Sequence, residues 1–208
     1  KEDRVSEITD MSDEHEEGQI VCSDRMGNSY VAVGQCVYFS TPFEKDKKYY
    51  TIGHKVEVLF CDRGDCLWVG TSGKGLWRMK DGSFEAFVIS SVAGNASLIY
   101  SIEQDQEGCM WVCTDIGIVK IDPSTNAVQT IIASEEARSD NRFLYRASMR
   151  SSSGVMYFGR NEGILAFNPS GNLVNVVRPK VTINAMTFRN GNAPVNALYH
   201  RSEVTLPY

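Results

Sequence analysis

Few residues in this sequence are arranged to carry out chemistry. The three histidines, His15, His54 and His200, lie far apart, and neither a His-Glu-x-x-His zinc motif nor a Gly-x-Ser-x-Gly nucleophile motif is present. Two acids, Asp62 and Asp105, recur at the same place before a turn, and this repetition favours capping of the turn over acid–base catalysis. We therefore expect no catalytic residue, no metal site and no cofactor.

Six cysteines are the remaining candidates for reactivity: Cys22, Cys36, Cys61, Cys66, Cys109 and Cys113. They do not form the two Cys-x-x-Cys pairs that would indicate structural zinc. Along one strand, Cys109 and Cys113 are about 13 Å apart, which is too far for a bond. We interpret the cysteines as small buried hydrophobes, and a disulfide between Cys22 and Cys61 stays open in an oxidising compartment.

A repeated pattern explains why the acids recur. Four segments combine a turn, formed by Asp or Ser and Gly, with an aromatic anchor, and the anchors are Tyr30, Trp68, Trp111 and Tyr157. These anchors are 38, 43 and 46 residues apart. Because Asp caps its own turn and Gly accepts a positive φ, each pattern predicts two strands joined by a tight turn.

Each unit is expected to contain four short antiparallel strands. The runs Val56–Cys61 and Leu98–Glu103 precede a turn, and the runs Ser83–Ile89 and Ala127–Ile132 close their units. Helical periodicity is nearly absent, with one potential helical turn at Ser134–Asp140. Four strands in about 40–45 residues are typical of a β-propeller blade, so we predict an all-β fold with about four blades.

Composition and charge argue against two classes of partner. The chain has 208 residues and a net charge of -5, and eight of its acids lie within residues 1–20, which we interpret as a solvated loop or tail. No stripe rich in Lys and Arg is present, so nucleic acid is not an expected partner. No run of about 18 apolar residues occurs, so any membrane attachment requires a segment absent from this chain.

The repeats carry a specific family resemblance. Residues 105–120, Asp…Gly-Cys-Met-Trp-Val-Cys-Thr…Gly-Ile-Val-Lys, resemble the two-component regulator propeller repeat, and so do residues 62–78. Residues 154–169, Gly-Val-Met-Tyr-Phe-Gly…Gly-Ile-Leu-Ala-Phe-Asn-Pro, resemble the terminal blade of that family. Residues 179–191 resemble the entry to the small β-sandwich that follows the propeller. The resemblance implies propeller blades over residues 1–178 and the start of a sandwich over residues 179–208.

Two units depart from the family pattern. The first has Ser29 and Tyr30 in place of Leu-Trp, and the second has Gly64 one place early, with Asp65 where Gly is usual. We expect these departures to reshape turns and to leave the fold intact. Because four blades are few for a ring, we also expect them to be the C-terminal part of a larger propeller.

The resemblance implies a setting and a function. Propellers of this family form the extracytoplasmic, periplasmic sensor of hybrid two-component systems, which are membrane histidine kinases fused to a response regulator in gut bacteria that degrade glycans. Known members bind oligosaccharides and are dimeric. For this chain the resemblance implies ligand sensing without enzymatic activity, an oligosaccharide or other small ligand as partner, and a homodimer.

A ligand site is expected on one rim of the propeller. The loops that join the second strand to the third, and each blade to the next, share that rim, and sugar recognition needs polar groups beside an aromatic platform. The polar and aromatic candidates on these loops and strand ends are Lys74, Asn95, Tyr100, Asp115, Arg142, Tyr145, Arg160, Asn161 and Glu162.

Two other functions stay open at the level of sequence. A propeller enzyme of the lyase or lactonase type would need acids and histidines that converge in the central funnel, often with a metal ion. A purely structural or dimerisation module would relay a signal from a ligand bound elsewhere, and it would associate through the tail from residue 179 onward.

Overall fold

The computed structural model describes residues 20–41, 48–91, 94–133, 142–171, 186–188 and 191–193. The chain divides into two compact units, Lys1–Val174 and Asn175–Tyr208. In the second unit, the described strands β18 (Met186–Phe188) and β19 (Gly191–Ala193) pair antiparallel. Most of the predicted sandwich region lies outside the described residues, so its fold stays a prediction.

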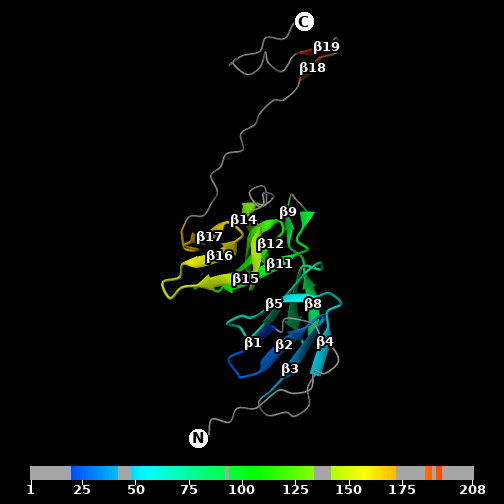
Figure 1. The fold of residues 1–208 in the computed structure, drawn as a ribbon, viewed down its shortest axis with the longest axis vertical. Coiled ribbons are helices and arrows are strands. Elements are labelled where there is room, and N and C mark those ends of the chain that lie inside the picture. Colours follow the sequence, from blue (N-terminus) through cyan, green and yellow to red (C-terminus); the bar gives the residue numbers. More distant parts are fainter. Residues whose placement is uncertain are drawn as a thin grey trace. The chain divides into compact units, whose positions relative to one another are not determined.

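The first unit consists of four antiparallel sheets that follow one another along the chain as blades, from the blue β1 to the yellow β17 (Figure 1). Blade 1 contains β1 (Ile20–Ser23), β2 (Ser29–Val33), β3 (Cys36–Ser40) and β4 (Lys48–Thr51). Blade 2 contains β5 (Val56–Cys61), β6 (Leu67–Thr71), β7 (Leu76–Lys80) and β8 (Ser83–Phe87). Blade 3 contains β11 (Ile99–Gln104), β12 (Met110–Thr114), β13 (Gly117–Asp122) and β14 (Ala127–Ala133). Blade 4 contains β15 (Phe143–Arg150), β16 (Met156–Arg160) and β17 (Gly163–Phe167).

These blades confirm the predicted all-β propeller fold. The strand predicted at Val56–Cys61 is β5, and the short hairpin of β9 (Ser90–Ser91) and β10 (Gly94–Asn95) lies between blades 2 and 3. The potential helical turn at Ser134–Asp140 falls outside the described residues. The membership of these blades in a larger ring stays a prediction. Nowhere in the described residues does a helix reach the length and apolar character that crossing a bilayer requires.

The apolar core consists of three clusters, each between consecutive blades. The innermost strands β1, β5, β11 and β15 contact one another in chain order. Trp68 is fully buried between blades 2 and 3 against Phe87, Ile99 and Met110, and Trp111 is fully buried between blades 3 and 4. The aromatic anchors therefore cover the surface between sheets, as the repeat predicts, and their burial supplies much of the hydrophobic stabilisation.

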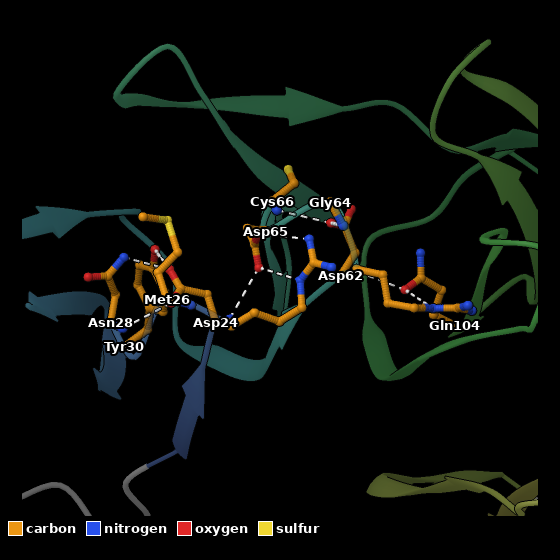
Figure 2. Close-up of polar contacts among 11 residues, drawn as sticks. Asp24, Met26, Asn28, Tyr30, Asp62, Gly64, Asp65, Cys66 and Gln104 are labelled. Carbon is orange, nitrogen blue, oxygen red and sulfur yellow. Dashed lines mark hydrogen bonds and ion pairs between the residues drawn. The ribbon is translucent and has the colours of Figure 1, made fainter.

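The first turn of each blade is held by one buried or half-buried side chain, as Figure 2 shows for blades 1 and 2. The Asp62 carboxylate accepts hydrogen bonds from the backbone N–H groups of Gly64 (2.8 Å) and Cys66 (2.9 Å), and also from the indole N–H of Trp68 (2.8 Å). Asp105 binds Trp111 in the same way, and Asp24 binds the Tyr30 hydroxyl. The acids are turn caps, as predicted, and each one also satisfies the polar atom of its aromatic anchor.

In blades 1 and 2, the residue after the capping acid joins its blade to the next one. Arg25 donates two side-chain hydrogen bonds to the Asp65 carboxylate, at 3.2 and 3.0 Å. Arg63 donates to the side-chain oxygen of Gln104 and to the backbone carbonyl of Gln106. Figure 2 shows Asp65 beside the first turn and Gln104 on the far side of Asp62. We call these contacts the arginine clamps.

The clamps explain one departure from the family pattern. Asp65 itself adopts the left-handed backbone conformation, with a φ of 61°, at the place where Gly is usual. A side chain in that conformation costs free energy. Asp65 offsets this cost through its ion pair with Arg25, which a Gly could not make. Hydrogen bonding to Arg25 also lowers the pKa of Asp65, so the carboxylate stays charged.

Candidate functional site

The end of the blades that carries the capped turns is regular. At the opposite end, the register of strand pairing is irregular. The pairing of β5 with β6 shifts register between Val56 and Val58, and the pairing of β11 with β12 shifts between Ile99 and Ser101. In blade 4 the shift is longer, between Phe143 and Ser148. Such bulges bend a strand and redirect its side chains, and they are frequent beside functional sites. Each bulge lies at the start of an innermost strand.

Two predicted aromatic residues meet in these bulges. The rings of Tyr100 and Tyr145 are 4.9 Å apart between centroids and tilted by 45°. Tyr100 is buried, at 8% exposure, whereas Tyr145 is 38% exposed and offers its ring to solvent. Burial raises the pKa of both phenols, and the Asp115 carboxylate raises them further. The two hydroxyls therefore stay protonated and able to donate hydrogen bonds at neutral pH.

Asp115 is held in place beside the tyrosines. Its carboxylate accepts hydrogen bonds from the backbone N–H of Ser97 at 3.0 Å and from the Ser97 hydroxyl at 2.6 Å. Asp115 lies in the loop between β12 and β13, and its own backbone N–H donates to the carbonyl of Leu98. A carboxylate has about four acceptor sites, so these bonds leave capacity for hydroxyl donors from a ligand.

A small pocket of about 180 Å³ is lined by Tyr100, Thr114, Asp115, Arg142 and Phe143. Arg142 is exposed at this pocket. The Arg160 guanidinium lies 4.7 Å from the centre of the Phe143 ring, and its Nε is buried without a hydrogen-bond partner among the described atoms. The pocket thus combines an aromatic wall with one anionic and one cationic group.

Glu57 also belongs to this end of the molecule, and sequence reasoning did not single it out. It occupies the bulge of β5, the position that Tyr100 occupies in β11. It is buried, at 7% exposure, and its carboxylate is 3.4 Å from the Lys55 ammonium. The charge of Glu57 contributes to the raised pKa of Tyr145, so the two side chains are near each other. The signal that could have identified it is its place in the repeat, one residue into the innermost strand.

Of the other residues predicted for the ligand site, some lie around the pocket and others lie away from it. The backbone N–H of Asn161 donates to the carbonyl of Arg142, and Glu162 follows on the same exposed turn. Lys74 and Asn95 are exposed on blade 2 and on the β9–β10 hairpin, and they do not line the pocket. The structure therefore brings together Tyr100, Asp115, Arg142 and Tyr145, with Arg160 behind Phe143.

The described residues contain no group of three or more His, Cys, Asp or Glu that could hold a metal ion. His54, the histidine within the described ranges, lies beside Gly73, far along the chain from the pocket residues. The pocket itself combines an aromatic surface with fixed polar groups, two features that ligand pockets in general share.

A family model agrees with the sequence pattern of blade 3. The model described as "Two component regulator propeller" matches residues 94–115, which run from β10 to the pocket residue Asp115. Residues 94–115 are thus similar to a two-component regulator propeller repeat. The resemblance expected from the sequence is thereby confirmed, and the matched segment includes two residues of the pocket, Tyr100 and Asp115.

One curated relative shares sequence with this chain. It is histidine kinase P4 of Formosa agariphila, which is 24% identical over 125 residues, a stretch that covers 60% of this chain and 9% of the relative. The chain therefore spans less than a tenth of the length of this relative.

Solved structures confirm the propeller fold. The extracellular domain of the putative hybrid two-component system BT3049 from B. thetaiotaomicron is similar, with a TM-score of 0.60 and 18% identity over 72% of this chain and 21% of that chain. The dihydro-heme d1 dehydrogenase NirN gives a TM-score of 0.59 at 10% identity, over 72% of this chain and 34% of that one. Because a sensor and an enzyme are similar to this extent, the fold alone does not assign a function.

Proposed function

We propose that this propeller is the ligand-sensing part of a hybrid two-component sensor and that it recognises a glycan or oligosaccharide. In this proposal the chain lies outside the cytoplasm, in the periplasm, and binding is relayed to a histidine kinase elsewhere in the same protein. The chain itself catalyses no reaction. The two-component regulator propeller repeat and the similarity to a histidine kinase support this setting.

The pocket at the bulged end is the observation that carries the proposal. Beside the pocket, Tyr145 offers an exposed ring against which the apolar face of a sugar ring packs, and this ring lies 4.9 Å from that of the pocket residue Tyr100. Asp115 accepts hydrogen bonds from sugar hydroxyls, and Arg142 donates them. Ligand pockets usually have about 300–1,000 Å³, so a pocket of about 180 Å³ fits one ring of a longer chain.

A thermal-unfolding screen tests the proposal. Oligosaccharides of defined composition are added to the full chain, and a ligand raises Tm by mass action if it binds the folded state. We expect at least one oligosaccharide to raise Tm for the native chain and to lose this effect in Tyr145→Ala. Tyr49→Ala is the matched control, because Tyr49 is an exposed tyrosine of blade 1, at 64% exposure, and has no part in the pocket.

The same screen separates the alternatives. If chromatography shows that the chain converts an oligosaccharide or a lactone into product, a propeller enzyme is favoured over a sensor. If no oligosaccharide in the panel shifts Tm, and if removal of the residues from 179 onward abolishes association, a dimerisation module is favoured. We propose that the sensor also forms a homodimer, which sedimentation of the full chain measures directly.

A further inference from the structure

Two cysteine thiols from neighbouring blades lie against each other. Cys22 is on β1, the innermost strand of blade 1, and Cys61 is on β5, the innermost strand of blade 2. These two strands contact each other, and the two Sγ atoms are 3.3 Å apart. All six cysteines are described, and in this structure each one is a free thiol.

The other four cysteines have different surroundings. The Cys66 thiol donates to the backbone carbonyl of Met79 at 3.3 Å, and the Cys36 sulfur is 3.7 Å from the Thr51 hydroxyl. Cys113 is fully buried, and Cys109 belongs to the turn that Asp105 caps. Thiol-to-thiol contact among the described cysteines is therefore specific to Cys22 and Cys61.

The geometry needs little change for a bond. A disulfide has an S–S length of about 2.05 Å, so the two sulfurs must approach by about 1.3 Å. Both cysteines are half-buried at the edge of the apolar cluster between blades 1 and 2. They are thus held in place by packing and still reachable by an oxidant or a reductant.

We propose that Cys22 and Cys61 form a disulfide that links blade 1 to blade 2 covalently. The oxidant is a disulfide donor, either a small-molecule disulfide or a thiol–disulfide oxidoreductase. The thiolate of one cysteine attacks the donor and displaces its first thiolate, which forms a mixed disulfide. The other cysteine then attacks the protein sulfur of that mixed disulfide and displaces the second thiolate. Two electrons pass to the donor, and the two thiol protons are released to the solvent or to the departing thiolates.

The surroundings of Cys22 disfavour its ionisation. The hydrogen bond with Cys61, and then burial, raise the pKa of Cys22 above its usual range. Cys22 therefore keeps its proton at neutral pH, which slows oxidation of the pair.

Peptide mapping tests the proposal on the full chain. The chain is reduced, then incubated with oxidised glutathione and a disulfide oxidoreductase, and blocked with N-ethylmaleimide under denaturing conditions. Trypsin releases residues 5–25, which contain Cys22, and residues 56–63, which contain Cys61. We expect these two peptides to be joined, and four of the six cysteines to carry N-ethylmaleimide.

Thermal unfolding supplies a second readout. A disulfide across a span of 39 residues restricts the unfolded chain, so oxidation is expected to raise Tm by on the order of 5–15 °C, and a reductant is expected to reverse the rise. Cys22→Ser and Cys61→Ser must each abolish both the link and the rise, whereas the matched control Cys36→Ser must keep both. Peptides that stay separate after oxidation of the native chain, or that join to other cysteines instead, would overturn the proposal.

Discussion

The two ends of the blades are built in opposite ways. At the turn end, Asp24, Asp62 and Asp105 occupy the same place in three blades, and each one binds its own turn and its own aromatic anchor. At the bulged end, the same place in the repeat holds Glu57 in blade 2 and Tyr100 in blade 3. Repetition marks the end that stabilises the fold, and variation marks the end that is available for recognition.

The difference has a physical basis. A buried carboxylate needs all its hydrogen bonds, so the turn end tolerates little change at the capping position. A bulge leaves one residue outside the ladder, so strand pairing does not dictate which residue type stands there. Blades therefore share a scaffold at one end and differ in chemistry at the other.

The largest expected effect comes from removing a cap at the turn end. Asp105→Ala leaves the Trp111 indole N–H and the Cys109 amide without an acceptor in a buried setting, and it removes an ion pair with Lys120. We expect a loss of at least about 3 kcal/mol in the free energy of unfolding, measured with urea. Asp122→Ala is the control, because Asp122 caps an exposed turn of the same blade and its loss should cost clearly less. Equal losses of unfolding free energy in Asp105→Ala and Asp122→Ala would contradict the contrast between the buried cap and the exposed cap.

A smaller effect is expected where the bulged end meets the next blade. A Cβ on Gly70 would lie 2.6 Å from Ile99 Cγ2 and 2.8 Å from Ile99 Cβ, closer than packed carbon atoms approach. Gly70→Ala should therefore lower the free energy of unfolding by about 1–3 kcal/mol through overpacking. Because Ile99 directly precedes Tyr100, the variant should also weaken ligand binding. A variant as stable as the native chain would show that the two blades adjust freely at this point.

The arginine clamps should differ from each other. Arg63→Ala removes side-chain bonds to Gln104 and Gln106 and should cost about 1 kcal/mol in urea unfolding. Arg25→Ala removes an exposed ion pair with Asp65, so it should cost less, and its cost should shrink further in high salt. If the loss of unfolding free energy in Arg63→Ala depends more strongly on salt than the loss in Arg25→Ala does, this assignment is contradicted.

The smallest effect concerns Glu103, which accepts a hydrogen bond from Ser148 across blades 3 and 4. Burial raises the pKa of Glu103. The unfolded chain then ionises this group at lower pH than the folded chain, so stability falls as pH rises from the usual Glu pKa of about 4.3 through the raised value. Glu103→Gln should be slightly more stable than the native chain at pH 7, and the difference should vanish near pH 3. A difference that does not depend on pH would exclude this cause.

The sequence predicts the regular end of the molecule well. The repeat of Asp, Gly and an aromatic anchor predicts the blades, the strand Val56–Cys61 and the capping role of Asp62. These features are local, because a turn and its two strands lie within a few residues of one another. The bond from the capping acid to the Trp68 indole is also local, and the recurrence of the two residues six apart could have revealed it.

The irregular end is predicted only in part. Three residues predicted for the ligand site, Tyr100, Asp115 and Arg142, line the pocket, whereas Lys74 and Asn95 do not, and their part in binding stays a prediction. A bulge shifts the register by one residue without changing the residue types, so alternation in the sequence does not reveal it. The same is true of the arginine clamps, because a contact between residues about 40 apart depends on how two blades pack.

The central claim is that recognition and stability are assigned to opposite ends of the blades. Calorimetric titration of the best-binding oligosaccharide, combined with the unfolding of the same variants, tests this claim most directly. Arg63→Ala should unfold more easily and keep the native Kd, whereas Tyr145→Ala should lose at least about tenfold in affinity. The reverse pattern, with weaker binding in Arg63→Ala and unchanged binding in Tyr145→Ala, would contradict the account.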